Sequence, residues 1–246
     1  MRNKEQWQPS KFVRYPNGYR ASRDRKMVGI GSRLVADILA QAYEQMLRNH
    51  ARGVLLDLGC GKVPLYEVYQ PLTTDVICID WANTLHPNQF LDVECDLNEG
   101  IELANDSVDT ILCTDVLEHI AEPERLWRDM ARVLRPGGKI LLAVPFFYRV
   151  HEAPHDYFRY TEFALKRFVA GAGLTLLSLE PYGGWPEVFA DLVGKRLAGI
   201  RSVSAIHLSL SQALIRTRWG RNLSAGTARD FPLGYTLVAQ KPASML

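Results

Sequence analysis

Residues 54–62 read VLLDLGCGK, and this stretch decides the fold. The segment from Val54 to Asp57 is predicted to be a buried strand, because an apolar run that leads into a Gly-Cys-Gly turn is typical of the interior of a parallel sheet. Gly59 and Gly61 allow a ligand to approach the backbone where a Cβ would clash. Ligands of open α/β sheets bind beyond the carboxyl ends of the strands, and this turn would lie there.

The turn differs from two other glycine-rich ligand loops. A dinucleotide fingerprint requires a third glycine where this chain has Pro64, and a phosphate loop ends in GK[ST], which this turn lacks. The acidic residue two places before the first glycine is Asp57. A carboxylate there would repel a pyrophosphate but suits the cationic end of a zwitterionic cofactor.

Five segments together resemble the class I S-adenosylmethionine-dependent methyltransferases. They are VLLDLGCGK, VICID ending in Asp80, VECDLN with Asp96, TDVLEHI and LRPGGKILLAVPF, and they follow the family's order and spacing from Val54 to Phe146. Many members carry a third glycine near the position of Val63, but the strand and the first two glycines are intact. The resemblance implies an α/β fold with a Rossmann-like seven-stranded sheet, helices on both faces and the last strand antiparallel.

Strand and helix signals alternate along the chain, which predicts a parallel sheet with right-handed crossovers. The predicted strands cover residues 54–57, 76–80, 90–95, 108–114, 139–144, 174–180 and 235–240, and the predicted helices cover 31–49, 64–69, 123–135 and 161–172. Residues 1–246 are expected to form a single methyltransferase domain. Within it, residues 1–50 are an irregular arm followed by a helix, and residues 183–231 are a helical insertion with two amphipathic helices.

The resemblance implies S-adenosylmethionine as the cofactor and assigns residues to it. Asp80 ends the second predicted strand, where a carboxylate accepts hydrogen bonds from both ribose hydroxyls. Asp96 would contact the adenine amine, with the Leu97 backbone near the ring, although Asp96 could instead cap the next turn. Asp57 or Asp115 would lie near the methionine ammonium. The turn itself completes the predicted cofactor set with Gly59, Cys60 and Gly61.

The segment after the fifth predicted strand, FFYRVHEAPHDYFRYT, is predicted to bind the methyl acceptor. His151 and His155 are candidate general bases near neutral pH, and His155 is favoured because of its polar neighbours. Arg159 offers a fork for a carboxylate or a phosphate. The alternative is a polar loop that satisfies its own groups. The candidate substrate residues are Asp156, Tyr157, Arg159 and Tyr160.

No metal site is expected. The spacing of His151 and His155 suits a divalent metal only on a helix, which Pro154 disfavours. Glu118 and His119 in the LEHI segment are expected to be structural rather than catalytic. None of the four cysteines forms a C-x-x-C pair, so all are expected to be buried, reduced thiols. They are Cys60, Cys78, Cys95 and Cys113.

Basic residues gather in two flanks of the sequence. Residues 1–33 and residues 192–229 each carry a net charge of +7, so residues 34–191 carry −12. Basic flanks at the open end of the sheet favour an anionic acceptor, such as a sugar nucleotide, a lipid-linked glycan or a carboxylated metabolite. Alternatively, both basic flanks are solvated and only neutralise the negative charge of residues 34–191, and the sequence favours neither interpretation over the other. For the insertion, the alternatives are packing on the domain, a substrate cover, a homodimer face and a peripheral membrane contact.

These patterns predict an S-adenosylmethionine-dependent methyltransferase that acts on a small-molecule or glycan-type acceptor, by O-methylation with a histidine base. Nucleic-acid methylation is disfavoured because no N-P-P-[YF] tetrapeptide follows the fourth strand. A cofactor-binding partner subunit without catalysis is an alternative of a different class. The polar start of the chain and the absence of an apolar run near ~20 residues predict a cytoplasmic protein without a transmembrane segment.

Overall fold

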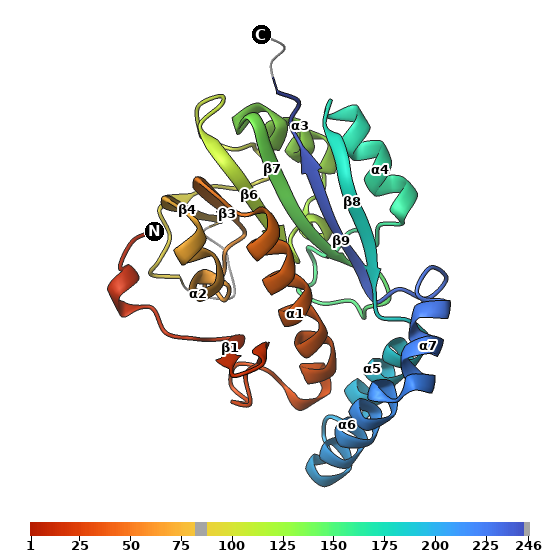
Figure 1. Ribbon diagram of the computed structural model, residues 1–246. Coiled ribbons are helices and arrows are strands. Elements are labelled where there is room, and N and C mark those ends of the chain that lie inside the picture. The colour runs from red at the N-terminus through yellow and green to blue at the C-terminus, as the bar shows by residue number, and fades with distance from the viewer. Residues whose placement is uncertain (82–87, 244–246) are drawn as a thin grey trace.

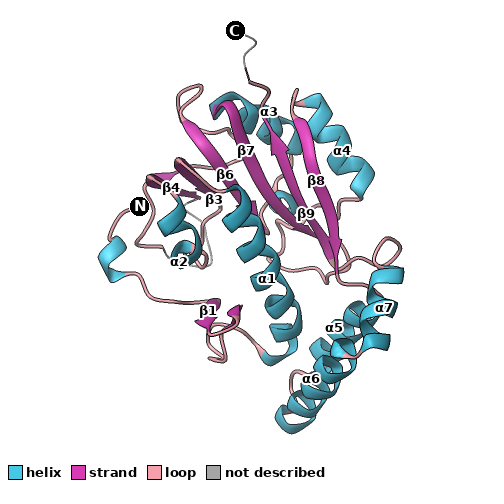
Figure 2. Cartoon of the chain, viewed as in Figure 1, coloured by secondary structure: helices cyan, strands magenta, loops and turns pink. Residues whose placement is uncertain are grey.

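A computed structural model describes residues 1–81 and 88–243, and it contains a seven-stranded sheet (Figure 1, Figure 2). The strand order is β5-β4-β3-β6-β7-β9-β8, and β9 runs antiparallel to both of its neighbours. This arrangement confirms the predicted fold class, including the antiparallel last strand. The strands are β3 (Val54–Leu58), β4 (Asp75–Asp80), β5 (Val93–Glu94), β6 (Val108–Thr114), β7 (Leu134–Pro145), β8 (Thr175–Tyr182) and β9 (Gly234–Gln240).

Helices cover both faces of this sheet (Figure 1). One face carries α1 (Arg33–His50) and α2 (Tyr66–Tyr69), and the other carries α3 (Pro123–Val133) and α4 (Glu162–Gly171). Successive side chains of a strand point to opposite faces, so β3 contributes to both layers. Leu55 packs in the apolar core between the sheet and α1, and Leu56 packs in the apolar core between the sheet and α3. The central strand is therefore buried on both sides, as its apolar sequence predicts.

The N-terminal segment contains a hairpin, so the prediction of an irregular arm was wrong. β1 (Phe12–Tyr15) pairs antiparallel with β2 (Gly18–Ala21), and Gly18 adopts a positive φ of 104° beside the turn. Two carboxylates of α1 hold the hairpin. Asp37 accepts the Ala21 N–H and Glu44 accepts the Tyr19 N–H, each at 2.9 Å. The sequence prediction missed the hairpin because its strands are short and these acceptors are distant in sequence.

The insertion between β8 and β9 contains three helices, where two were predicted. Figure 1 shows them beyond the end of the sheet at which the parallel strands finish, on the same side as the N-terminal hairpin. The third helix was missed because its sequence contains two glycines and few large apolar residues; it is capped by Thr217, whose hydroxyl accepts the Gly220 N–H at 2.9 Å. The three are α5 (Trp185–Leu197), α6 (Arg201–Arg216) and α7 (Arg218–Thr227).

Other differences from the prediction concern the ends of elements. β5 has two residues rather than six, because the Asp92 carboxylate accepts the Cys78 N–H (2.8 Å) where a longer strand would pair. β7 begins five residues before the predicted start. The LEHI segment, which lies between two predicted elements, forms a 3₁₀ turn, Leu117–His119. The other 3₁₀ turns are Lys4–Gln6, Ile30–Ser32 and Gln70–Leu72. Among the described helices, none combines the length and apolar character needed to cross a bilayer.

Candidate functional site

The glycine turn after β3 has one packed glycine and one open glycine. Gly59 has φ +62°, and a Cβ there would lie 2.4 Å from Val116 Cγ2. A side chain at this position would therefore collide with the loop that follows β6. Gly61 has φ +50°, but among the described residues no atom lies within 4 Å of the position of its Cβ. The backbone at Gly61 therefore borders open space, which a cofactor needs in order to approach it.

Asp80 lies beside this open space at the end of β4. Its Oδ2 accepts the Gly61 N–H and its Oδ1 accepts the Trp81 N–H, each at 2.9 Å. The two hydrogen bonds fix the carboxylate next to the glycine turn, where the resemblance placed the ribose of the cofactor. Geometry and sequence prediction agree at this position.

The other residues that were predicted to contact the cofactor near Asp80 are buried or already hydrogen-bonded within the chain. Asp96 is exposed, and its Oδ1 accepts hydrogen bonds from both the backbone and the side-chain nitrogen of Asn98, each at 2.9 Å. This is the turn-capping arrangement that was the alternative for Asp96. Leu97 and Cys60 are both buried, and the Cys60 sulfur accepts a hydrogen bond from Asn88.

Asp57 and Asp115 occupy different environments. Asp57 is only 4% exposed and accepts a hydrogen bond from the Tyr69 hydroxyl at 2.9 Å. Burial raises the pKa of Asp57 to about 7. Asp115 follows β6 with φ +56° and accepts hydrogen bonds from Lys11 Nζ and the Tyr43 hydroxyl, each at 3.1 Å. Of the two candidates for the methionine ammonium, Asp115 is already paired with a cation from the N-terminal segment.

The raised pKa of Asp57 predicts a pH-dependent stability. Between the ordinary aspartate pKa near 4 and about 7 the folded protein holds a proton that the unfolded chain has lost, so this group lowers stability as pH rises. Asp57→Asn, which keeps an acceptor for Tyr69, is expected to gain about 2–3 kcal/mol relative to the wild type between pH 5 and pH 8. Urea unfolding at both pH values measures this gap, with the exposed Asp75→Asn as control. A gap that does not change with pH would contradict the assignment.

A cavity of about 280 Å³ lies at the carboxyl ends of β6 and β7. Val35, Ala36 and Leu39 of α1 give it an apolar wall. The opposite side is polar, and most of its groups come from the loops that follow the two strands. The polar residues of the lining are Lys11, Ser32, Asp115, Glu118, His119, Tyr148, His151, Glu152 and Tyr182.

Glu118, His119 and His151 meet on the polar side of this cavity. Glu118 Oε1 lies 3.8 Å from the Nε2 atoms of both histidines. The Glu118 side chain is fully buried, and neither of its oxygens has a hydrogen-bond partner among the described residues. Burial, with the nearby charge of Asp115, raises the pKa of Glu118 well above its usual range. The sequence prediction gave Glu118 and His119 structural roles, and it missed their meeting with His151 because that residue follows the next strand.

The rest of the loop after β7 holds His151 in place. Asp156 is buried and accepts two hydrogen bonds from Arg159, at 2.6 and 2.8 Å, and one from the His151 N–H at 2.9 Å. The Arg159 guanidinium also donates to the carbonyls of Tyr148, Arg149 and Phe158. The Arg159 guanidinium, which was expected to bind a substrate anion, is therefore paired with Asp156 within the chain.

The remaining predicted acceptor residues lie outside the lining of this cavity. His155 Nδ1 is 3.0 Å from the Tyr157 hydroxyl, and the ring of His155 packs edge-on against Trp81. Tyr157 is 45% exposed. Tyr160 is buried in the core, where its hydroxyl donates to the Leu117 carbonyl at 3.0 Å. Of the two candidate bases, the structure places His151 at the cavity and His155 beside it.

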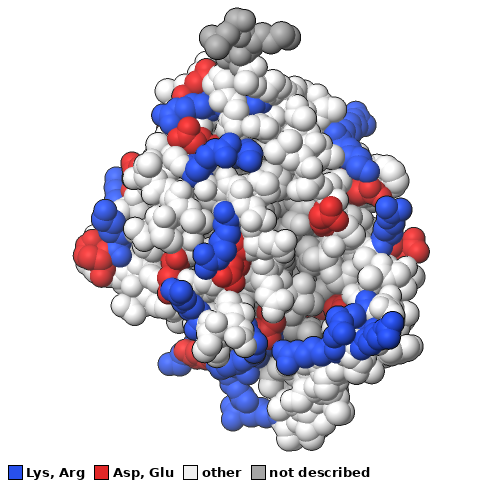
Figure 3. Space-filling model, in the orientation of Figure 1, with Lys and Arg blue, Asp and Glu red and all other residues white. Residues whose placement is uncertain are grey.

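A second cavity, of about 320 Å³, shares Gly29 and Ser32 with the first. Its charged lining is entirely basic among the described residues. Figure 3 shows Lys and Arg side chains over the lower part of the molecule, the region of the N-terminal hairpin and helices α5–α7. Lys195 is paired with Asp191, and its Nζ lies 3.4 Å from the ring centre of Tyr148. The basic lining residues are Arg25, Arg149, Lys195 and Arg201.

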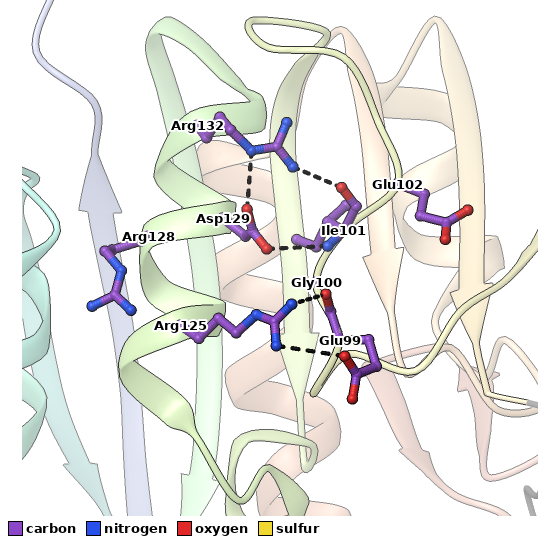
Figure 4. Close-up of a pocket in the computed structure, with 8 residues that line it drawn as sticks. All are labelled: Glu99, Gly100, Ile101, Glu102, Arg125, Arg128, Asp129 and Arg132. Atoms are coloured by element: carbon purple, nitrogen blue, oxygen red, sulfur yellow. Dashed lines mark hydrogen bonds and ion pairs between the residues drawn. The ribbon is translucent and has the colours of Figure 1, made fainter.

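A third cavity, of about 350 Å³, lies between α3 and the loop that precedes β6 (Figure 4). Its polar groups are largely paired with one another. Asp129 accepts hydrogen bonds from Arg132 Nε and the Ile101 N–H, and Arg132 also donates to the Ile101 carbonyl. Arg125 pairs with Glu99. These contacts fasten the loop to the helix, and the cavity is separate from the predicted cofactor and acceptor residues.

A family model described as a methyltransferase domain matches residues 56–142, which run from β3 to β7. The match contains the glycine turn, Asp80, Asp115 and the LEHI segment, and it coincides with the strands that carry the candidate site. Residues 56–142 belong to the class I S-adenosylmethionine-dependent methyltransferases. The cofactor of this family is S-adenosylmethionine, and the open space at Gly61 beside the fixed carboxylate of Asp80 fits it.

Curated relatives match parts of this chain. A ubiquinone biosynthesis O-methyltransferase of Parvibaculum lavamentivorans is 31% identical over 97 residues, which are 36% of this chain and 38% of the relative. An uncharacterized 37.1 kDa protein in transposon TN4556 of Streptomyces fradiae is 30% identical over 216 residues, which are 75% of this chain and 61% of the relative. The chain thus spans less than half the length of the O-methyltransferase relative.

Solved structures share the fold. The [4+2]-cyclase SpnF has a TM-score of 0.54 at 17% identity, covering 85% of this chain and 84% of the other. An S-adenosylmethionine-dependent methyltransferase from Mesorhizobium loti has a TM-score of 0.53 at 13% identity, covering 84% and 99%. At these identities the likeness supports the Rossmann-like fold of the sheet and nothing finer.

Proposed function

We propose that this protein transfers the methyl group of S-adenosylmethionine to an oxygen of a small-molecule or glycan-type acceptor bound in the 280 Å³ cavity. The observation that carries the proposal is the cluster of buried Glu118 with half-buried His119 and His151, which lines the cavity at the end of the sheet where the family binds its cofactor. The names of the curated O-methyltransferase relatives support oxygen as the acceptor atom.

The transfer needs no protein nucleophile, because the acceptor oxygen attacks the activated methyl group directly. Holding the two substrates in line contributes about 7–11 kcal/mol toward the barrier. Removing the proton of the acceptor hydroxyl contributes about 10²–10⁴-fold. We assign that proton transfer to the cluster that contains His151, and no longer to His155, because His151 lines the cavity.

Asp80 provides the test of cofactor binding. Calorimetry with S-adenosylhomocysteine is expected to give one site, and Asp80→Ala is expected to weaken it at least about tenfold, since each hydrogen bond to a charged group contributes roughly 1.5–3 kcal/mol. The exposed Asp75→Ala on the same strand is the matched control. Equal affinity of wild type and Asp80→Ala would remove Asp80 from the site. Binding without methyl transfer to any oxygen acceptor would favour the partner-subunit alternative.

The acceptor is proposed to be anionic. The basic cavity adjoins the acceptor cavity through Gly29 and Ser32, so an acceptor whose hydroxyl lies near His151 can place a phosphate or carboxylate among Arg25, Arg149 and Arg201. Arginine suits this role because its planar guanidinium binds such groups through two hydrogen bonds. The net charge of residues 1–33 alone does not indicate which arginines would bind the acceptor. Two of them have partners within the chain, since Arg23 is paired with Asp37 and Arg20 stacks on Tyr15.

The double variant Arg25→Ala/Arg201→Ala is expected to raise the KM for an anionic acceptor about tenfold or more, with little change in kcat or in cofactor affinity. Wild-type KM is expected to rise with ionic strength, because salt screens exposed charges beyond ~8 Å near physiological concentration. The control is Arg14→Ala/Arg48→Ala, which removes the same charge outside the basic cavity. A neutral acceptor used equally well by both double variants at low and high salt would contradict this proposal.

A further inference from the structure

We propose that Glu118, His119 and His151 form a binding site for one first-row divalent metal ion, such as Zn²⁺ or Mn²⁺. The inference deepens the proposed function, on which its catalytic meaning rests, by naming the group that activates the acceptor oxygen. It replaces the expectation of no metal, which considered only the spacing of His151 and His155.

The three side chains present one ligand atom each to a common point. Glu118 Oε1, His119 Nε2 and His151 Nε2 all lie within 4.8 Å of one another, and the two distances from the carboxylate are 3.8 Å. Ligands about 2.1 Å from a metal lie roughly 3.0–3.4 Å apart, so small side-chain movements close the site. Two imidazoles and one carboxylate would leave coordination positions for water or substrate, and all three residues line the cavity.

The surroundings of both histidines orient their Nε2 atoms toward the carboxylate. His119 Nδ1 lies 2.6 Å from the His155 carbonyl, which accepts its hydrogen and leaves the Nε2 lone pair available. His151 Nδ1 lies 3.3 Å from Asp156 Oδ2 but makes no hydrogen bond among the described residues, so the His151 ring is held less directly than the His119 ring; the Asp156 carboxylate itself is held by Arg159. Metal-binding histidines commonly have such a carbonyl or carboxylate partner on the second ring nitrogen. Both supports come from the loop after β7.

The burial of the Glu118 carboxylate supports a metal site independently of the ligand distances. Glu118 has no exposed surface, and both of its oxygens lack hydrogen-bond partners among the described residues. An unpartnered buried carboxylate costs several kcal/mol when it is charged. A divalent ion satisfies the carboxylate and both imidazoles at once. The donor set favours Zn²⁺ or Mn²⁺ over Mg²⁺, which prefers oxygen ligands and retains its waters.

The chemical role follows from the open positions. In the metal-loaded site His151 is a ligand and no longer the base: a bound divalent ion would lower the pKa of a coordinated acceptor hydroxyl, which would release its proton to water in the cavity and attack as an oxyanion. The C–S bond to the methyl group then breaks as the new C–O bond forms, and S-adenosylhomocysteine leaves. No electron is transferred to or from the metal.

The test titrates tag-free, chelator-treated full-length protein with Zn²⁺, Mn²⁺ and Mg²⁺ by calorimetry. We expect one Zn²⁺ or Mn²⁺ per chain, a rise in the melting temperature on loading, and much weaker binding of Mg²⁺. Glu118→Gln and His151→Ala are each expected to lower Zn²⁺ affinity more than 10-fold, since even outer partners of a ligand contribute 10–100-fold. His155→Ala, whose side chain lies outside the cluster, is the matched control and is expected to keep wild-type Zn²⁺ affinity.

Two readouts separate this inference from its alternatives. Glu118→Gln without metal is expected to melt at or above the wild-type temperature, because it removes a buried ionisable group. If Glu118→Gln bound Zn²⁺ with wild-type affinity, the proposed metal site would be wrong. Wild-type protein that binds neither Zn²⁺ nor Mn²⁺, yet transfers methyl groups at full rate with chelator present, would overturn the metal and leave the proposed function standing. Stoichiometric Zn²⁺ binding lost in Glu118→Gln, without any affinity for S-adenosylhomocysteine, would support the metal and refute the proposed function.

Discussion

Replacing His151 with alanine is expected to lower turnover by about 10²-fold or more while S-adenosylhomocysteine affinity stays within about twofold. His151 lies on the acceptor cavity next to Glu118, and the glycine turn and Asp80 belong to other elements. The expected loss therefore appears in kcat, measured by transfer of a labelled methyl group at saturating cofactor.

His155→Ala is the matched control for His151→Ala, because it removes the same side chain from the same loop at a position beside the cavity. We expect a change in turnover below about tenfold for His155→Ala. If His155→Ala lost as much turnover as His151→Ala, the choice between the two histidines would be reversed. Restored turnover of His151→Ala with added imidazole would favour direct proton transfer over a metal.

Asp156→Ala is expected to lower the free energy of unfolding by roughly 1.5–3 kcal/mol, because it removes the charged acceptor of the hydrogen bonds from Arg159 and from the His151 backbone. Asp156 is almost completely buried and accepts hydrogen bonds from Arg159 and from the His151 backbone. Arg159 ties the same carboxylate to three backbone carbonyls of the loop. Chemical denaturation of wild type and variant measures the loss.

The control for Asp156→Ala is Glu162→Ala, which breaks the more exposed pair with Lys166 on α4. Exposed ion pairs contribute about 0–1 kcal/mol, so this variant is expected to unfold close to the wild type. Losses of equal size in the two variants would mean that the Asp156 pair contributes no more than an exposed pair.

Much of the fold could be predicted from sequence because its signals are local. The run from Val54 to Asp57, the glycine turn that follows it and the alternation of strands and helices indicated the parallel sheet, and the resemblance to the family implied the antiparallel last strand. Asp80 was predicted for the same reason, since it ends a strand that must lie beside the glycine turn. The structure shows Asp80 beside the turn, with a hydrogen bond from Gly61, and its contact with the cofactor stays a prediction.

The acceptor side could not be predicted in the same way, because it depends on contacts between distant segments. His155 was favoured over His151 for its sequence neighbours, but the path of the loop directs His151 toward Glu118. Arg159 was expected to face a ligand, but Asp156, three residues earlier, takes its guanidinium. Pairs such as Lys11 with Asp115 join residues 104 positions apart, and no local pattern indicates them.

The position of β9 has a consequence for how the chain folds. β9 lies between β7 and β8, so these two strands have no direct hydrogen bonds to each other and are joined only through a strand that follows both of them in the chain. Helices α5–α7 precede β9 and are therefore synthesised before the sheet is complete. Such long-range pairing slows folding, because the entropy of closing the loop is lost before the contacts form. A ribosome-bound chain that stops before Gly234 would expose the edges of β7 and β8, and chaperones that recognise unpaired strands would meet this protein at that stage.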